Sequence, residues 1–363
     1  MKNYLCIDQS DRRTKPLFLG LPSRLYGEDC PQDLSTEKQL LNGKHPLSTD
    51  VEIFPFVVIN PCGIALCRCL LTYYPHDPTA YVGFFEARPE IDAVRELFRR
   101  VEEKALSDGK TTLLGPIDVS IYINYRFKTN LFDRTYTSEP YNKDYYPDLW
   151  EKCGFSVRDR YVSNQLRKVN ADDIDPRLQK IHDRYIARGY AFTSPTKQNF
   201  KQCLGDVYEA MMRLYSDFSG FKPISRSQYM KLFMPLEKAL NFDMVKLVYQ
   251  NGQLCAFSVA IPNYRYLTRG KRTLRKLLGI MRTKRAPDEY VVLYMGADRS
   301  VSGLGGSLAH CMRNAFYQLQ CTSIGALIKE GQVTGQMYDS LYTDQFQYVL
   351  LCKEITAQKE SVC

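Results

Sequence analysis

The segment YVVLYMGADRSVSGLGGSL, from Tyr290 to Leu308, decides the fold. It opens with an apolar run typical of a strand, breaks at polar residues, passes Gly303, Gly305 and Gly306, and continues as a helix from Ser307. This order leaves backbone amides uncovered by side chains at the positive end of the helix dipole. The segment therefore predicts an anion cradle. The alternative is a glycine turn that only lets the helix pack closely on a sheet.

The glycine spacing separates the known phosphate-binding loops. The dinucleotide fingerprint GxGxxG needs a third glycine that Gly303-x-Gly305-Gly306 lacks at that position. A P-loop needs a lysine directly after the glycines, and none follows here. What remains resembles the G-x-G pyrophosphate loop of GNAT acyltransferases, with the usual signature Arg/Gln-x-x-Gly-x-Gly/Ala. Ser300 stands where the Arg/Gln belongs, and Arg299 is one residue early.

Composition indicates an ordinary globular protein that is long enough for two domains, with 363 residues of which 44% are hydrophobic and 25% charged. The N-terminal residues lack the pattern of a signal peptide, and no run reaches the ~18 apolar residues of a membrane span. The twelve cysteines include no CxxC pair, and the four histidines are far apart in the sequence. We therefore expect free thiols, no metal site and a cytoplasmic protein, possible membrane contact being peripheral only.

The positive charge is concentrated in the second half. Residues 1–170 contain 23 basic and 23 acidic residues, whereas residues 171–363 contain 26 basic and 17 acidic ones. The window 264–285 has nine basic residues and no acidic one. Such an asymmetry predicts an anionic partner near the C-terminal half, such as CoA, a carrier protein, nucleic acid or lipid headgroups.

Apolar patterns repeat in the two halves after a polar, turn-rich start that ends near residue 47. The first half has a predicted hairpin of strands 51–60 and 64–73 around Pro61-Cys62-Gly63. A strand at 81–86, a helix at 91–105, a strand at 111–114, a short helix that begins around 145–148 and a strand at 160–166 are predicted to follow. The second half begins with predicted helices at 198–217 and 225–239 and a hairpin around Asn251-Gly252. It continues with a basic helix, the strand to residue 295, a helix at 307–320, a strand at 323–328, a short helix at 336–342 and a strand at 348–352.

Nearly the whole chain resembles bacterial double-GNAT proteins. The marks of this resemblance are Gly83-Phe84-Phe85-Glu86, Gly115-Pro116-Ile117-Asp118, Tyr141-Asn142-Lys143-Asp144-Tyr145-Tyr146 with Gly154-Phe155, and the loop Gly303-Leu304-Gly305-Gly306. The resemblance implies an α/β fold of two tandem GNAT-like mixed-sheet domains side by side, with the glycine loop only in the C-terminal one. The implied division is an N-terminal extension (1–50), a degenerate GNAT-like domain (51–168) and a C-terminal GNAT domain that binds the acyl donor (169–363).

The resemblance also implies a co-substrate, which is acyl-CoA or an acyl-phosphopantetheine on an acyl carrier protein, and no metal. A strand-edge amide near 294–297 would polarise the thioester carbonyl. The donor-binding residues expected from it are Met295, Gly296, Ala297, Gly303, Leu304, Gly305, Gly306 and Ser307.

Catalytic candidates follow from the need to deprotonate an amine and protonate a thiolate. Asp298, Glu330 and Asp118 are candidate bases, and Tyr338 and Tyr342 are candidate acids; Asp298, Glu330 and Tyr338 are the ones we select. Counted back from Gln345-Phe346, however, the customary tyrosine position holds Leu341. Each candidate has a structural alternative: a turn cap for Asp298, a solvated strand end for Glu330 and packing for a tyrosine. His310 is expected to be structural.

The basic window contains an apolar stripe at helical spacing, namely Leu274, Leu277, Leu278 and Met281. A solvated helix is the simplest explanation, but the charge exceeds what one CoA requires, which favours an acidic acyl carrier protein or an anionic membrane surface. The predicted function is an N-acyltransferase that moves an acyl group to an amine of a small molecule or peptide. The alternatives are a catalytically silent GNAT-fold binding protein and an aminoacyl-tRNA-dependent transferase; nucleic acid is otherwise not an expected partner.

Overall fold

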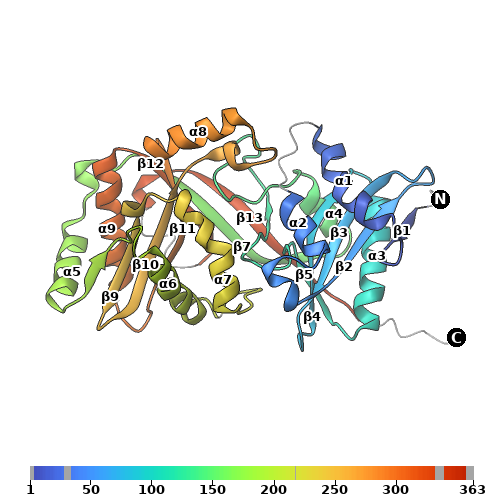
Figure 1. Ribbon diagram of the computed structural model, residues 1–363, viewed down its shortest axis with the longest axis horizontal. Helices are drawn as coiled ribbons and strands as arrows, with labels where there is room; N and C mark the ends of the chain where they lie inside the picture. The colour runs from blue at the N-terminus through green and yellow to red at the C-terminus, as the bar shows by residue number, and fades with distance from the viewer. Residues whose placement is uncertain (1–3, 28–33, 217, 332–338, 357–363) are drawn as a thin grey trace.

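A single 13-stranded sheet runs through the computed structural model of the chain, which describes residues 4–27, 34–216, 218–331 and 339–356 (Figure 1). Twelve strands follow one another across it in the order β1-β2-β3-β4-β5-β13-β7-β12-β11-β10-β9-β8, and β6 pairs with β13 at its side. The strands are β1 (Leu5–Ile7), β2 (Glu52–Ile59), β3 (Ala65–Tyr73), β4 (Thr79–Ala87), β5 (Thr112–Gly115), β6 (Phe127–Lys128), β7 (Ser156–Leu166), β8 (Ala191–Thr193), β9 (Val245–Gln250), β10 (Gln253–Pro262), β11 (Glu289–Ala297), β12 (Thr322–Lys329) and β13 (Tyr342–Glu354).

Helices cover both faces of each end of the sheet. The α-helices are α1 (Thr14–Tyr26), α2 (Leu34–Leu41), α3 (Ile91–Ser107), α4 (Tyr146–Glu151), α5 (Pro176–Ala187), α6 (Phe200–Leu214), α7 (Arg226–Phe233), α8 (Leu274–Arg285) and α9 (Leu304–Leu319). Phe98 of α3 and Trp150 of α4 lie in one buried cluster of the first half, whereas Phe18 of α1 lies in another. In the second half α6 and α7 pack on one face of the sheet, and α9, with α5 on its outer side, packs on the other.

The sheet has the same strand plan on both sides of its centre. One order of elements occurs twice, as β2-β3-β4-α3-β5 and as β9-β10-β11-α9-β12. In each case an antiparallel hairpin is followed by a third strand, a helix, and a fourth strand that is parallel to the third. The parallel pairs β4/β5 and β11/β12 hold equivalent places in the two halves. The repeat predicted from the apolar pattern is therefore present in the fold.

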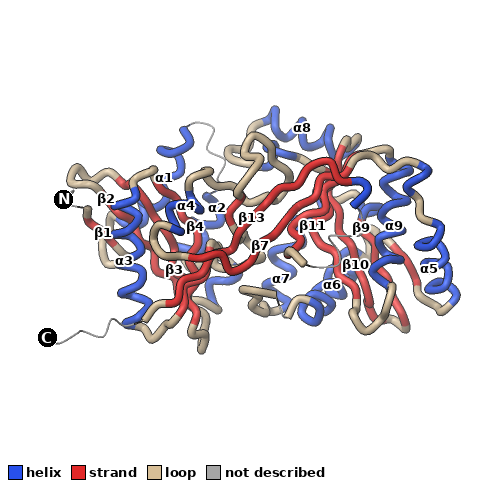
Figure 2. Tube along the Cα trace, turned by 180° about the vertical axis from the view of Figure 1, so that it is seen from behind, coloured by secondary structure: helices blue, strands red, loops and turns tan. Residues whose placement is uncertain are grey.

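The two halves exchange their last strands at the centre of the sheet. β7 follows β5 and α4 along the chain but pairs with β12 of the second half, and β13 follows β12 but pairs with β5 of the first. β7 and β13 also pair with each other over most of their length, from Tyr342↔Leu166 to Cys352↔Ser156. Figure 2 shows these two long strands crossing from one half to the other. The halves consequently share main-chain hydrogen bonds as well as side-chain contacts.

Several elements differ from the sequence prediction. The segment before residue 47 is not simply turn-rich: it contributes β1, which pairs with β2, and α1 and α2. The helix α1 was not predicted because it contains Pro22 and because its apolar residues follow one another too closely to show a clear helical spacing. The second half also contains α5 and β8, which were not expected, and β7 and β13 extend beyond the runs predicted for them because they also pair with each other. The short helix predicted at 336–342 falls largely outside the described residues.

Candidate functional site

The parallel pair β11/β12 separates halfway along and opens a cavity. The two strands pair only from Glu289↔Thr322 to Val292↔Gly325. Beyond Val292, β11 continues alongside β10 to Ala297, with a bulge that places an extra residue, Leu293, between the pairs Ala260↔Val292 and Val259↔Tyr294. Among the described residues, no strand thus pairs with the edge of β11 that faces away from β10 from residue 293 onward. It borders a cavity of about 780 Å³.

The cavity lies between the two halves and extends to both faces of the sheet. Its wall combines Tyr125 and Arg126 from the first half, Phe218 and Tyr294 from the core on the α6 side, and Met312 of α9. Its other lining residues of note for the site are Met295, Gly296, Ala297, Arg299, Gly305, Lys329, Leu341 and Tyr342. The cavity is thus mostly apolar and aromatic, with a few polar groups on its wall, as ligand pockets commonly are.

One hydrogen bond accompanies the departure of β12 from β11. The backbone amide of Leu327 donates to Ser163 Oγ of β7 at 2.9 Å, in the interval between Gly325 and Ile328 where the β12–β7 register shifts. Leu327 has φ +65°, a left-handed conformation that a leucine rarely adopts. Ser163 is fully buried. The bulge in β12 is therefore held by a side chain of the first half.

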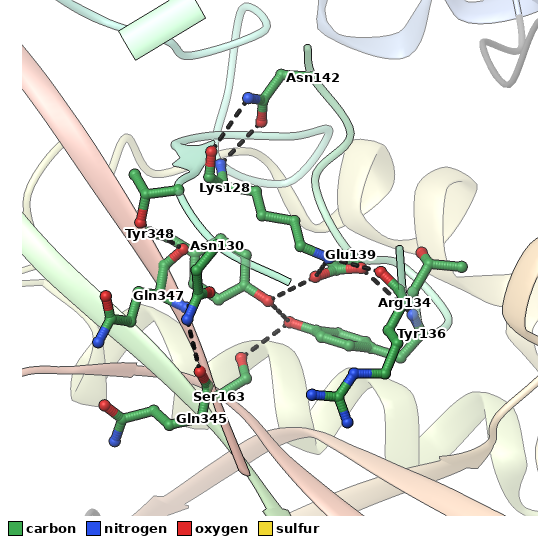
Figure 3. Close-up of polar contacts among 12 residues, drawn as sticks. Lys128, Asn130, Arg134, Tyr136, Glu139, Asn142, Ser163, Gln345, Gln347 and Tyr348 are labelled. Atoms are coloured by element: carbon green, nitrogen blue, oxygen red, sulfur yellow. Dashed lines mark hydrogen bonds and ion pairs between the residues drawn. The ribbon is translucent and has the colours of Figure 1, made fainter. Parts of the chain in front are cut away.

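A buried polar chain supports Ser163 from the other side (Figure 3). Ser163 Oγ lies 2.8 Å from the Tyr136 hydroxyl, which lies 3.0 Å from the hydroxyl of Tyr348, which is in turn 2.8 Å from Glu139 Oε1. The Lys128 Nζ pairs with that same Glu139 oxygen at 2.8 Å. Burial lowers the pKa of Lys128, although the Glu139 carboxylate opposes this shift. The chain fixes the first-half segment 128–139 against the exchanged strands β7 and β13.

The equivalent opening in the first half is filled by the protein itself. β4 and β5 pair only from Thr79↔Thr112 to Tyr81↔Leu114, and the next residues of β4 then bind the segment after β5. The Val82 carbonyl accepts from the Ile117 amide at 2.8 Å, the Phe84 amide donates to the Asp118 carboxylate, and the Ala87 amide donates to the Tyr146 hydroxyl at 3.0 Å. The edge of β4 beyond Tyr81 is thus hydrogen-bonded to other described segments of the first half.

Two glycines of the first-half resemblance permit this close approach. A Cβ at Gly83 would lie 2.1 Å from the Ile117 carbonyl oxygen, and one at Gly115 would lie 2.4 Å from the Val82 carbonyl oxygen. The connection from β4 to α3 is also short, from Arg88 to Glu90, whereas the connection from β11 to α9 runs from Asp298 to Gly303. The two halves, although similar in plan, therefore differ in whether the separation of their parallel strands opens onto a cavity.

The glycine loop connects β11 to α9 as expected, but its glycines face different neighbours. Gly303 has φ +86°, where a glycine is favoured, and a Cβ there would lie 3.7 Å from Ile181 of α5. A Cβ at Gly306 would lie 3.4 Å from Leu178 of the same helix. Gly305 lines the cavity. Within the described residues the amides of Gly305 and Gly306 donate to no acceptor, as expected for the first turn of a helix.

The other predicted donor-binding residues divide into two groups. Met295, Gly296 and Ala297 line the cavity with Gly305. Leu304 is buried in the core between α9 and the sheet, and the buried Ser307 has its hydroxyl 3.1 Å from His182 Nδ1 of α5. These two side chains therefore contribute to the packing of α9 and not to the cavity wall.

Two of the three selected catalytic residues, Asp298 and Glu330, are not among the residues that line the cavity. Asp298 accepts from the amide and the hydroxyl of Ser300, and these hydrogen bonds lower the pKa of its carboxyl. Glu330 is exposed after β12, where its amide donates to the Arg160 carbonyl. Tyr338 lies outside the described residues. Tyr342, the other candidate acid, lines the cavity next to Leu341.

Asp118 is partly buried and His310 is buried, and neither lines the cavity, although Asn124, which donates to Asp118, does. Asp118 lies in the first half, where burial raises the pKa of its carboxyl to about 6, against hydrogen bonds from the Phe84 amide and Asn124. His310 lies between α9 and α5, with its Nε2 2.8 Å from Gln179 Oε1 and burial lowering its pKa. The hydrogen bonds of Asp118 and His310 to neighbouring side chains and backbone are those of residues that stabilise the packing of their segments.

Sequence reasoning missed the aromatic and basic groups that do line the cavity. Burial raises the pKa of Tyr125 and raises that of Tyr294 to about 12, so both hydroxyls stay protonated near neutral pH. The Tyr215 hydroxyl donates to the Met295 carbonyl at 3.1 Å, at the open edge of β11. Arg126, between Tyr125 and Phe127 in the sequence, carries no pattern that distinguishes it from other basic residues. No Asp, Glu or His of the described ranges lines the cavity.

Comparison with known proteins gives matches only at the level of structure, since no protein-family model and no curated protein sequence matches the chain. A fungal multi-domain β-N-acetylglucosaminidase contains a GCN5-related glucosamine N-acetyltransferase region that matches 97% of this chain with a TM-score of 0.52 at 12% identity. The match spans 38% of that fungal chain. A conserved Enterococcus faecalis protein of unknown function, described as a probable N-acyltransferase, has a TM-score of 0.50 at 8% identity, with 97% of this chain and 73% of that chain covered.

A tandem GNAT protein from the clavulanic acid biosynthesis pathway matches 99% of this chain over 100% of its own length, at 13% identity and a TM-score of 0.48.

Within the described residues, no helix has the length and apolar character required to span a membrane. The repeated strand plan, the separated parallel pair and the fungal and enterococcal matches lead to one conclusion on the fold. The chain has a double-GNAT, N-acetyltransferase-like fold, in which two GNAT-like halves share one mixed sheet.

Proposed function

We propose that this protein is an N-acyltransferase that takes an acyl group from a thioester, carried by CoA or by an acyl carrier protein, and transfers it to an amine. The observation that supports this most strongly is the cavity at the β11/β12 separation, which is bordered by the free edge of β11 and by Gly305 at the start of α9. The edge could hold a thioester arm, and the helix terminus could hold the donor's phosphates. The fold of solved N-acetyltransferase regions agrees with this proposal.

The chemistry requires that the thioester carbonyl be polarised and that the leaving thiolate be protonated. A backbone amide on the open edge of β11, between Leu293 and Ala297, would donate to the carbonyl oxygen. Tyr125, Tyr294 and Tyr342 line the cavity, and a tyrosine hydroxyl among them could donate the proton that the leaving thiolate needs. Burial raises the pKa of Tyr125 and Tyr294, which makes these two hydroxyls weaker acids than an exposed tyrosine. The amine would arrive neutral or lose its proton to water, since no carboxylate or imidazole of the described part lines the cavity.

The location of the cavity supports an acceptor site between the halves. The first half contributes Ile121, Tyr125 and Ser138 to the wall, opposite β11 and β12. An acceptor bound there would reach the thioester through the gap between the two strands. In this proposal the first half binds no donor, because its own segment 115–118 fills the equivalent opening.

The main alternative is a GNAT-fold protein that binds a thioester without turning it over. The cavity wall favours this alternative in one respect, because the described part provides no general base there. Aminoacyl-tRNA-dependent transfer also stays open, because the basic surface of the second half could contact RNA.

A two-part experiment separates these possibilities. Calorimetry with acetyl-CoA, longer acyl-CoAs and an acyl carrier protein measures donor binding, and release of free thiol in the presence of amines measures transfer. The transferase proposal predicts binding of at least one donor and amine-dependent thiol release. Binding without release would support the silent protein. Absence of binding by every thioester, with salt-sensitive binding of aminoacyl-tRNA, would support the third alternative.

A further inference from the structure

A buried arginine on the cavity wall has no acidic partner among the residues that the structure describes. Arg126 is 2% exposed, and its Nε and Nη1 atoms make no hydrogen bond within the described residues. No described carboxylate lies within ion-pair distance of its guanidinium, whereas Lys329, a partly buried cation of the wall, pairs with Asp159 at 2.6 Å. Because an uncompensated buried charge costs several kcal/mol, an arginine in this state requires an explanation.

The surroundings of Arg126 hold its guanidinium in place but leave its charge unneutralised. The guanidinium carbon lies 3.6 Å from the ring centroid of Tyr125 and 4.8 Å from that of Tyr161. Burial raises the pKa of both tyrosines, so neither provides a negative charge. Glu139, which contacts Tyr348 in the polar chain described above, is already paired with Lys128.

The backbone at Arg126 is also in an unusual conformation. Its φ is +69°, and its amide donates to the Pro116 carbonyl at 2.9 Å. A left-handed conformation at a residue other than glycine is costly, and such costs are concentrated at binding and catalytic sites. The conformation, the stacked rings and the missing partner all occur at one residue that lines the proposed substrate cavity.

We infer that Arg126 binds a carboxylate group of a substrate inside this cavity. The flat guanidinium, with an aromatic ring on its face, leaves its N–H edge for the two oxygens of a carboxylate. This inference specifies the substrate class of the proposed transferase and rests on that function. The carboxylate belongs either to the acceptor, as in an amino acid, or to the acyl group, as in a dicarboxylic acyl thioester.

The test compares matched charged and neutral probes on wild type, Arg126→Gln, Arg126→Lys and the control Lys329→Gln. The acceptor arm titrates L-phenylalanine and L-phenylalaninamide by calorimetry, with phenylacetate and phenylacetamide as a simpler pair. The donor arm titrates succinyl-CoA and propionyl-CoA. We expect at least a tenfold preference for the charged member of one pair in wild type, lost in Arg126→Gln and reduced in Arg126→Lys, which keeps the charge but not the planar fork. Lys329→Gln should keep the preference.

The outcome identifies the source of the carboxylate and separates this inference from the proposed function. A preference in the acceptor arm assigns the carboxylate to the amine, and one in the donor arm assigns it to the acyl group. Propionyl-CoA should bind wild type and Arg126→Gln equally, because it has no free carboxylate. If neither protein binds it, the proposed transferase function is contradicted, whereas the inference on Arg126 is not. Equal affinities within every pair, no binding of any carboxylate, or a preference that survives Arg126→Gln would overturn the inference. Melting temperatures at or above the wild-type value would show that the variant folds.

A second, independent observation concerns α8 and the residues before it. Its apolar stripe faces solvent: Leu274 is 74% exposed, Leu278 58% and Met281 69%. The inner side of the helix rests on the core through Gly279, next to Leu267, and through Ile280. Figure 1 shows α8 along the outer edge of the molecule, away from the sheet.

Basic residues surround this stripe without acidic partners. Lys271, Arg272, Arg275, Arg282 and Arg285 are exposed, and none forms an ion pair within the described ranges. The remaining four cations of the window have other roles. Arg265 pairs with Asp288, and Arg269 donates to the Glu139 carbonyl. Lys276 and Lys284 donate to the carbonyls of Arg269 and Lys238. An outward-facing apolar stripe with cations on both sides has the character of a helix that lies in a lipid headgroup layer.

We propose that α8 docks the protein on an anionic membrane surface. The stripe residues are mostly exposed and line neither the site cavity nor the smaller cavity between α6 and the sheet. A stripe that faces outward in this way suits a planar headgroup layer better than the helix of a carrier protein. The leucines and the methionine would enter the acyl boundary, and the arginines would contact lipid phosphates.

Vesicle flotation tests this proposal with three proteins. Wild type should float with vesicles that contain phosphatidylglycerol and not with pure phosphatidylcholine, and less at higher salt, because the Debye length is about 8 Å at 0.15 M. Leu278→Asp with Met281→Asp, and separately Arg272→Glu with Arg275→Glu, should reduce flotation at least fivefold. Ile186→Asp, at a residue of α5 that is 53% exposed, is the matched apolar control, and Lys197→Glu with Lys201→Glu is the matched charge control. The membrane proposal is overturned if wild type does not float with anionic vesicles, or floats equally with neutral vesicles. It is also overturned if wild type binds an acyl carrier protein but no vesicles.

Discussion

The hydroxyl oxygen of Ser163 on β7 accepts a 2.9 Å hydrogen bond from the backbone amide of Leu327 on β12. This contact links the first half of the chain to the strand whose departure from β11 opens the cavity. Because β7 and β13 are exchanged between the halves, the first half holds the site open although the donor would bind in the second. The two halves are therefore one functional unit on this account.

Replacing Ser163 by Ala should lower the free energy of unfolding. The Leu327 amide and the buried Tyr136 hydroxyl would both lose a partner, and an unsatisfied buried group costs about 1–3 kcal/mol. Ser156→Ala, at the exposed start of the same strand, should change stability little. Urea denaturation measures both. Equal effects of the two substitutions would show that the contact at the bulge is not important for stability.

The glycine loop gives the second prediction. Gly305→Asp should weaken acyl-CoA binding at least tenfold, because it adds a carboxylate and a Cβ at a residue of the first turn of α9 that lines the cavity, where the donor's phosphates would bind. Gly20→Asp, on α1 with no heavy atom within 4 Å of its Cβ position, is the charge control. Calorimetry measures the affinity, and the melting temperature monitors folding. Wild-type affinity in a folded Gly305→Asp protein would remove the loop from the donor site.

Arg299 provides a third test. It stands one residue before the position at which the GNAT loop signature has Arg or Gln, and it is exposed at the cavity. Arg299→Ala should reduce affinity for acetyl-CoA about three- to tenfold at low salt, and less at high salt, because an exposed charge is screened. Arg12→Ala, at an exposed residue of the first half, serves as control. A loss that does not vary with salt would indicate a structural role for Arg299.

The fourth prediction concerns the pH dependence of stability. Burial raises the pKa of Glu86 from 4.5 to about 6, although hydrogen bonds from Tyr26 and Tyr146 oppose the shift. Since the folded state holds this proton more tightly than the unfolded chain, the carboxyl does not affect stability below pH 4.5. As pH rises through 4.5 to 6 it lowers the unfolding free energy, by up to about 2 kcal/mol at pH 7.5.

Glu86→Gln removes this ionisation and keeps an acceptor for the tyrosines. The stability of the variant relative to wild type should therefore rise between pH 4.5 and pH 7.5, whereas Glu52→Gln, at an exposed position of β2, should show no such trend. Urea titrations at the two pH values provide the comparison. A constant difference between Glu86→Gln and wild type would mean that Glu86 titrates normally in the folded protein.

Local sequence patterns predicted most of the individual helices and strands, because side-chain periodicity and turn residues identify such elements. The hairpins β2-β3 and β9-β10, the helix α3 and the segment from β11 to α9 have alternation, helical spacing or turn residues that identify them. The double-GNAT architecture also followed from the resemblance. The exchange of β7 and β13 could not be predicted, because strand partners at the centre of the sheet are determined by long-range pairing that a local pattern does not encode.

The candidate site was predicted in part, for the same reason. Met295, Gly296, Ala297 and Gly305 follow from the strand and loop, and they do line the cavity. Arg126 comes from a distant segment, and only the tertiary structure shows that its charge is buried with no acidic partner among the described residues. Leu304 and Ser307 have a glycine-loop position in the sequence, but the rotation of α9 directs them to the core and to α5.

The most direct test of the central claim is a calorimetric titration of the intact chain with acetyl-CoA, read for stoichiometry in wild type and in Gly305→Asp. The account predicts one site per chain in wild type, because the β11/β12 separation is open while the β4/β5 separation is filled by Ile117 and Asp118. It also predicts loss of that site in Gly305→Asp. Two sites per chain, or one site that Gly305→Asp leaves unchanged, would contradict it.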